Sequence, residues 1–158
     1  MVRMIYPIKL TDDALDGGFT VTCRDFPEAI SQGDTLTDCL VEAADCLEEA
    51  IASRIKRGAE ISEPSAPLEG EQLVAVPLSM SLKAALYQAM KEDGISKSEL
   101  ARRLECDEKD IRRMLDPRHP TKGPAIEKAL ALLGRHVVIG IRKQPEGDAS
   151  SYSSGRLY

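Results

Sequence analysis

The sequence predicts an α+β unit followed by an all-α domain that contains a helix-turn-helix. Two patterns carry this prediction: short runs of alternating apolar and polar residues around one long amphipathic stretch, and helical spacing of apolar residues further along. We expect a β-β-β-α-β domain over residues 1–77, with its helix against one face of the sheet. Helices ending in a short C-terminal strand are expected over residues 78–142, and a disordered tail over residues 143–158.

Three strand signals lie before the long amphipathic stretch. Residues 2–10 place alternate apolar side chains on one face, and Gly17-Gly18 marks the turn into a second, antiparallel strand over residues 19–23. Residues 29–33 are expected to form a short third strand. These strands would form a hairpin extended by one further strand.

A long helix and a fourth strand complete the first domain. The helix is expected from Leu36 to Arg57, because its apolar residues follow the helical period and Gly58 stands at the usual C-terminal cap position. Residues 59–70 are rich in Pro, Ser and Glu and indicate a connector. Residues 73–77 are then expected to add a strand to the same sheet.

Residues 96–115 predict two short helices joined by a three-residue turn. Ser96 and Glu99 have capping-box spacing at the start of the first helix. Asp107 and Asp110 repeat that spacing at the start of the second. Both helices are therefore expected to begin at a side-chain cap.

The packing positions of these two helices agree with a helix-turn-helix. Leu100 and Ile111 are spaced to fill the inside corner, and the small Ala101 allows the second helix to cross closely. The pattern over residues 79–134 resembles the Xre/Cro-like helix-turn-helix family, although many members have Gly where this chain has Glu105. We therefore expect a somewhat different turn, and an ordinary helical hairpin is the alternative.

The exposed face of the second helix is basic and suits DNA. Arg and Lys side chains there can reach phosphates and guanine edges in a major groove. A further helix is expected over residues 122–133, capped by Thr121, and its N-terminus favours phosphate. Arg102 and Arg103 fit a solvated face equally well. The residues predicted to bind DNA are Lys97, Ser98, Lys109, Arg112, Arg113 and Lys122.

Charge divides the chain into two unlike parts. Residues 1–70 hold 6 Lys and Arg against 14 Asp and Glu, a net charge of −8, whereas residues 71–158 hold 15 against 12, a net charge of +3. The acidic part suits a basic partner, and the basic part suits nucleic acid.

A homodimer or a higher homo-oligomer is also expected. One small helix-turn-helix reads few bases, so proteins of this kind usually bind two half-sites as dimers. The strand-like run at residues 136–141 has no neighbouring strand in the sequence, and pairing between subunits is one solution.

The cysteines and histidines indicate neither disulfides nor a metal site. Cys23, Cys39, Cys46 and Cys106 contain no C-x-x-C pair, and with the two histidines they form no zinc-like spacing. No apolar run has the length of a signal or membrane-spanning segment. We expect a cytoplasmic protein with no metal, no cofactor and no membrane partner.

The order of these elements resembles the HicB antitoxins over about residues 3–142. The most specific segments are FTVTCRDFPEAISQGDTLTDCLVEAADCLEE and SKSELARRL…IRRMLDPRHPTK. The resemblance implies an N-terminal domain with a partial RNase H-like fold that covers a small basic HicA-like toxin, an mRNA-cleaving ribonuclease. It also implies that the helix-turn-helix binds the promoter of its own operon, so that the chain is a repressor and an antitoxin.

The turn after the second strand is the predicted contact with the toxin. An aromatic side chain flanked by carboxylates could contact a basic protein there. For Phe26, a position in the core is an equal alternative. For Tyr6, on the first strand, a position in the core is slightly favoured over a contact with the toxin. The residues predicted to bind toxin are Tyr6, Asp25, Phe26, Pro27 and Glu28.

Two other functions stay open. A transcription regulator could use the N-terminal domain to sense a small molecule. A metal-dependent nuclease could use the acidic turn at Asp12, Asp13 and Asp16, but it is disfavoured because no pair of carboxylates is evident on the strands. We therefore expect a protein that acts by binding and is not an enzyme.

Overall fold

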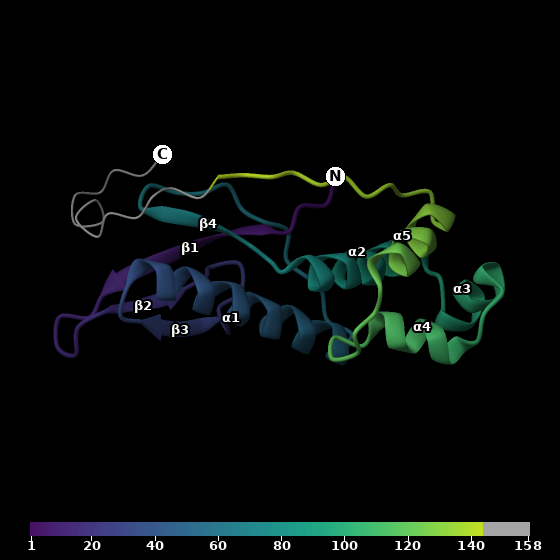
Figure 1. Cartoon of the computed structure of the whole chain (residues 1–158), viewed down its shortest axis with the longest axis horizontal. Helices are drawn as coiled ribbons and strands as arrows, with labels where there is room; N and C mark the ends of the chain where they lie inside the picture. The colour runs from purple at the N-terminus through teal and green to yellow at the C-terminus, as the bar shows by residue number, and fades with distance from the viewer. Residues whose placement is uncertain (144–158) are drawn as a thin grey trace. The chain divides into compact units, whose positions relative to one another are not determined.

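The computed structural model describes residues 1–143, which form two compact units (Figure 1). The first unit comprises Met1–Ala50 and Ser62–Pro77 together with residues 142–143, and the second comprises Ile51–Ile61 and Leu78–Ile141. The predicted α+β class is confirmed. The tail predicted from residue 143 lies, apart from its first residue, outside the described residues.

The first unit contains a four-stranded antiparallel sheet with the order β3-β2-β1-β4. Its strands are β1 (Ile5–Asp12), β2 (Phe19–Thr22), β3 (Ile30–Gly33) and β4 (Glu71–Ala75). β1 begins three residues later than residue 2, where the sequence pattern placed its start, because pairing with β4 begins at Ile5 opposite Ala75. Leu10 faces Val21 on β2, so β1 is an interior strand that pairs with β2 on one side and β4 on the other.

Helix α1 (Leu36–Arg57) has the bounds that the sequence predicted. Thr35 caps it, since its Oγ1 accepts from the backbone N–H of Asp38 at 3.2 Å. Its apolar side is buried from Leu36 to Ala50 and supplies the core of the first unit together with Tyr6, Ile8, Val21 and Val74. Gly33 is required where β3 approaches α1, because a Cβ there would lie 2.9 Å from the Cys39 Sγ.

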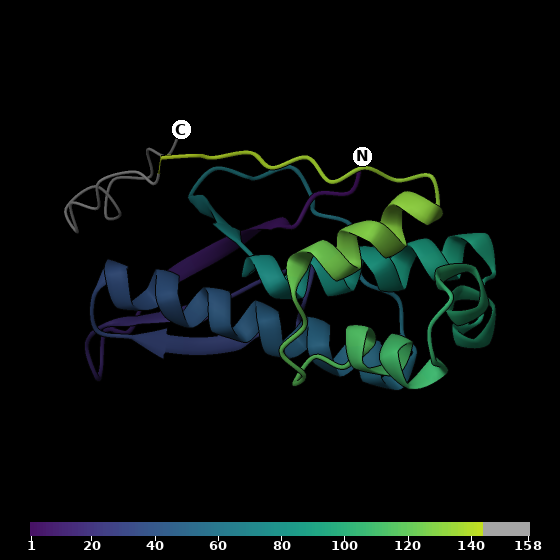
Figure 2. The same cartoon turned by 45° about the vertical axis from the view of Figure 1, so that its right-hand side comes forward.

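The second unit contains four shorter helices (Figure 2). They are α2 (Leu78–Asp93), α3 (Lys97–Leu104), α4 (Glu108–Leu115) and α5 (Gly123–Leu132). Leu100 and Ile111 are fully buried and Ala101 is nearly so, which confirms the predicted inside corner between α3 and α4. The rest of this core comes from α2 and α5, notably Leu86, Ile126 and Ala129.

The turn between α3 and α4 corrects one expectation. Glu105 adopts the left-handed conformation, with φ 52° and ψ 45°, which is the region that glycine favours at helix ends. The backbone N–H of Cys106 reaches back to the Ala101 carbonyl at 3.1 Å. The chain therefore keeps the glycine-type turn without glycine, at a cost of about 1 kcal/mol in backbone strain.

Two predicted caps are wrong, whereas the predicted Ser96 cap is confirmed. The Ser96 Oγ accepts from the backbone N–H of Glu99 at 3.1 Å. Asp107 occupies the N-cap of α4 without a side-chain hydrogen bond to the helix. Helix α5 has Lys122 at its N-cap, because the Thr121 hydroxyl is used elsewhere, as a donor to the Arg113 carbonyl.

The predicted C-terminal strand is also wrong for the described residues. Residues 136–141 are assigned to neither a strand nor a helix. A strand requires a neighbour to receive its backbone hydrogen bonds, and β1 to β4 all pair with one another in the first unit. Val138, Ile139 and Ile141 are instead exposed, at 77%, 63% and 94% of their surface.

Candidate functional site

The basic residues predicted on α4 lie on the surface of the second unit. Lys109, Arg112 and Arg113 are all exposed, while Ile111 and Leu115 face the core. An eight-residue helix with one fully buried side and one basic side can present its charges outward only. The geometry therefore provides a cationic surface that a polyanion can reach.

Glu108 organises the N-terminal end of this surface. One carboxylate oxygen accepts from the Ser98 Oγ at 2.8 Å, and the other accepts from the Arg112 guanidinium at 2.6 Å. These hydrogen bonds, first from Ser98 and then from Arg112, lower the pKa of Glu108. The network brings two of the predicted DNA-binding residues together and places exposed Lys97 beside them in the chain.

The C-terminal end of α4 is held by the chain that follows it. The Thr121 hydroxyl donates to the Arg113 carbonyl at 3.2 Å. Exposed Lys122 follows Thr121 in the chain, so its backbone lies near this end of the helix. The backbone N–H of Asp116 donates to the Arg112 carbonyl at 2.9 Å and closes the helix. Lys122 and Arg113 thus come from neighbouring backbone positions.

The basic residues of α3 are paired with a carboxylate on their own helix, as Arg112 and Arg113 are on α4. Arg102 and Arg103 both donate to the Glu99 carboxylate, at 2.7 and 2.9 Å. These two guanidinium groups lower the pKa of Glu99 to about 2, which keeps it charged in all but strong acid. The pairing agrees with the solvated face that the sequence left open for these two arginines.

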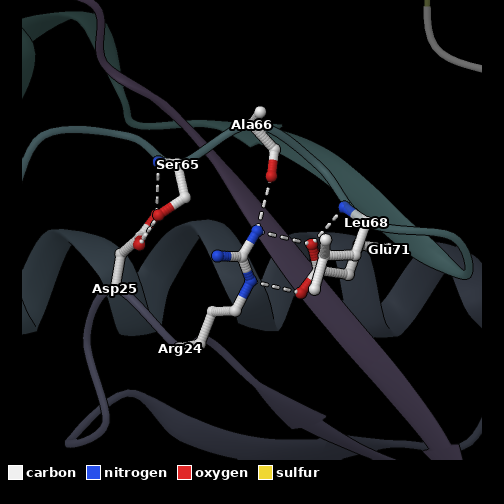
Figure 3. Close-up of polar contacts among 6 residues, drawn as sticks. All are labelled: Arg24, Asp25, Ser65, Ala66, Leu68 and Glu71. Carbon is white, nitrogen blue, oxygen red and sulfur yellow. Dashed lines mark hydrogen bonds and ion pairs between the residues drawn. The ribbon is translucent and has the colours of Figure 1, made fainter.

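The segment predicted to contact a toxin is anchored at its N-terminal end by residues 65–71. Figure 3 shows Arg24 between Glu71 and the Ala66 carbonyl, and Asp25 accepting from the backbone N–H and hydroxyl of Ser65. The Arg24 guanidinium binds both Glu71 carboxylate oxygens, at 2.8 and 3.0 Å, and lowers the pKa of Glu71. Residues 65–71 are therefore held to the first unit by defined polar contacts.

Tyr6 and Phe26 lie in the core beneath this segment. Both are 0% exposed, and their rings meet edge to face with centroids 4.9 Å apart. The Tyr6 hydroxyl donates to the Ser62 carbonyl at 2.7 Å. In this conformation neither side chain has surface for a direct contact, so the core alternative describes their positions.

Pro27 and Glu28 are the exposed tip of the same segment. The tip follows a tight turn in which the backbone N–H of Ala29 donates to the Phe26 carbonyl at 2.8 Å. The outer side of α1 adds further acidic groups to the surface of this unit. They are Asp38, Glu42, Asp45 and Glu49.

Sequence reasoning missed the residues that hold these surfaces in place. Arg24 and Glu71 are 47 positions apart, and no local pattern links them. Lys83, which binds the end of α4, looks in the sequence like any lysine on an amphipathic helix. Glu108 could have been found, because it stands four residues before Arg112 on one helix face.

Neither a metal site nor a membrane span appears in the described residues. Over residues 1–143, no group of three or more His, Cys, Asp or Glu side chains is placed to hold a metal ion. No helix in that range combines the length and apolar character needed to cross a membrane.

Comparison with known proteins identifies the family. A family described as HicB-like antitoxins of bacterial toxin-antitoxin systems matches residues 5–85. Antitoxin HicB of Escherichia coli K12 is 34% identical over 134 residues, which span 85% of this chain and 96% of that protein. Antitoxin HicB 2 of Photorhabdus laumondii is 37% identical over 135 residues, spanning 85% and 94% of the two chains. The chain therefore belongs to the HicB-like antitoxin family.

Proposed function

We propose that this antitoxin neutralises a small basic, HicA-like ribonuclease toxin by direct binding and represses its own operon by binding promoter DNA. The observation that carries the proposal is the separation of charge. In the first unit α1 exposes Asp38, Glu42, Asp45 and Glu49, whereas α4 in the second unit carries three basic residues against two acidic ones. One chain thus offers one surface to a basic protein and another to nucleic acid.

The toxin is proposed to bind the first unit around Pro27 and Glu28, with the acidic side of α1 steering its approach. Burial raises the pKa of Glu48, and the charges of Asp45 and Glu49 add to that effect, which marks a strongly negative stretch of helix. Asp25 acts by holding the tip in place through Ser65, and Phe26 and Tyr6 act as its core support. Inhibition is by covering the toxin, and the antitoxin performs no chemistry.

The DNA is proposed to bind the second unit in the manner of a helix-turn-helix, with α4 in the major groove. Arg112 and Arg113 are placed for bases or phosphates, and Lys109 joins them on the same short helix. Lys97 and Ser98 flank its start and Lys122 follows its end, where they would contact the phosphate backbone. A protein that binds its own promoter would act in the bacterial cytoplasm, where the operator lies.

Two copies are proposed to associate through the exposed apolar run at residues 137–141. Val137 is half-buried against the core of the second unit, while Val138, Ile139 and Ile141 are exposed. Packing against the same run of a second copy would cover these side chains. Deleting residues 137–141 is expected to lower the oligomer mass by light scattering and to weaken promoter binding; unchanged mass and affinity would remove this part of the proposal.

A co-expression experiment tests the central claim. The untagged chain is produced with the tagged product of the small basic gene beside its own, and pull-down is combined with a growth assay. Co-purification and rescue of growth are expected. A Glu28→Lys variant should weaken both, whereas the same charge change at exposed Glu127 on α5 serves as the matched control. Absence of both binding and rescue in the unmodified chain would refute the toxin claim.

A second experiment tests the DNA claim. Arg112→Ala is expected to cost on the order of 1–3 kcal/mol in promoter binding if the guanidinium makes a bidentate base contact. Arg102→Ala removes the same charge from α3, at a side chain that is 72% exposed and paired with Glu99, and should have little effect. Binding that survives loss of both Arg112 and Arg113 would exclude α4 as the reading helix.

A further inference from the structure

A buried ammonium group lies behind the basic face of α4. Lys83 on α2 is 2% exposed, and among the described residues it is the only charged side chain that is buried. Burying a charge is costly unless every donor finds an acceptor. Burial lowers the pKa of this lysine, while the charge of Asp116 opposes that shift.

The Lys83 ammonium has three hydrogens, and three acceptors surround it. Its Nζ lies 3.2 Å from the Arg113 carbonyl, 3.0 Å from the Met114 carbonyl and 3.0 Å from the Thr121 Oγ1. The two carbonyls belong to the last turn of α4, whose carbonyls have no partner within the helix. A cation at this end is also favoured by the helix dipole.

Thr121 makes this arrangement a closed network. Its hydroxyl accepts from Lys83 and donates to the Arg113 carbonyl at 3.2 Å, so Lys83 joins two neighbouring segments that lie 30 or more residues after it in the chain. The three segments are α2, the end of α4 and the loop that precedes α5 (Figure 2). A helix of eight residues has little stability alone and takes its position from such contacts.

We propose that Lys83 is a positioning residue for DNA recognition, whose buried ammonium fixes the end of α4 and Thr121 so that Arg113 and Lys122 meet the DNA at a set spacing. The inference rests on the proposed DNA binding by α4. Lys83 itself touches no DNA, because its side chain is enclosed. Without the ammonium, the Met114 carbonyl loses its Lys83 donor and the Arg113 carbonyl keeps only the Thr121 hydroxyl and the Asp116 N–H, so the last turn of α4 can shift. A misplaced Arg113 would then lose sequence-specific contacts while non-specific attraction to phosphate persists.

The test uses the full chain and two duplexes of equal length, one from its own promoter and one unrelated. Binding is followed by fluorescence anisotropy across a salt series, at a temperature where circular dichroism finds each variant folded. Lys83→Met keeps the apolar stem and removes the ammonium, and Thr121→Val removes one of its three partners. Lys91→Met is the matched control, because Lys91 lies on the same helix but is exposed and donates to the Gly58 carbonyl at 3.0 Å.

A positioning role predicts a change in discrimination, which a merely stabilising role would not produce. Lys83→Met is expected to weaken promoter binding at least tenfold and the unrelated duplex less than twofold. The salt slope for the promoter should change by less than one, because the attraction to phosphate persists. Thr121→Val should lower the ratio of promoter to unrelated binding at least threefold, and Lys91→Met should leave it unchanged.

Several outcomes would overturn the inference. The inference fails if Lys83→Met and Thr121→Val both bind the promoter within twofold of the unmodified chain. It also fails if these variants lose equal affinity for the promoter and for the unrelated duplex. If Lys83→Met does not fold, Thr121→Val decides alone by the same ratio. Failure of the unmodified chain to prefer its promoter would overturn the proposed DNA binding as well, and this result is distinct from a preference that the variants retain.

Discussion

Replacing Phe26 separates a core role from a direct contact with the toxin. The ring is 0% exposed and packs against Tyr6 with an interplanar angle of 75°. Phe26→Ala removes this buried ring and is expected to cost about 3–5 kcal/mol of unfolding free energy, a large part of the roughly 5–15 kcal/mol that stabilises a typical domain. Phe26→Leu keeps most of the volume and loses the aromatic pair, so about 1–2 kcal/mol is expected.

The assay pairs thermal unfolding with calorimetric titration of the purified toxin. Phe26→Leu should lower the melting temperature by several degrees and leave toxin affinity within about twofold at a temperature where the variant is folded. Glu28→Lys should leave the melting temperature nearly unchanged and weaken toxin binding, because the side chain is exposed and lies at the tip. A tenfold loss of affinity in folded Phe26→Leu would refute the argument from burial and restore Phe26 as a contact.

Three further predictions concern the turn at Glu105, the Arg24–Glu71 ion pair and Glu108 on α4. Glu105→Gly is expected to stabilise the second unit by up to about 1 kcal/mol in urea unfolding, because glycine relieves the strain at φ 52° but is more flexible when unfolded. The lowered pKa of Glu71 means that its bond to Arg24 stabilises the fold above pH 4.5 and less as the pH falls. Arg24→Ala should therefore reduce the melting temperature at pH 7, and the difference from the unmodified chain should shrink as the pH falls below 4.5. Glu108→Gln should raise affinity for unrelated DNA at least about twofold by anisotropy, because it removes a negative charge beside Arg112.

Local periodicity predicted the helices and the four strands of the sheet, but it also predicted a strand at residues 136–141 that the structure lacks. The spacing of apolar residues indicated α1 from Leu36 to Arg57, and the structure has those bounds. The corner of Leu100 and Ile111 followed from the same reasoning, because positions that face inward on two short helices have few alternatives. Such predictions succeed since a helix buries one side whatever its neighbours are.

Prediction failed where the partner of a residue is distant in sequence. Thr121 looked like a helix cap, but its hydroxyl is taken by Lys83 and the Arg113 carbonyl, and a long-range contact prevailed over a local preference. Residues 136–141 have strand composition, yet a strand forms only beside another strand. Neither outcome is encoded within a short window of sequence.

The residues predicted to contact the toxin do not all lie on the surface, and the contacts of Arg24 and Asp25 with residues 65–71 are part of the reason. The sequence placed Asp25, Phe26 and Glu28 together as an aromatic residue among carboxylates, and the structure assigns them unlike environments. Asp25 binds Ser65, Phe26 is in the core, and Glu28 is exposed. The order of these three along a turn requires this division, because successive side chains point in different directions. A partner that recognises this segment would therefore meet a rigid tip whose shape is set from below and from one side, and little ordering entropy would be lost when it binds.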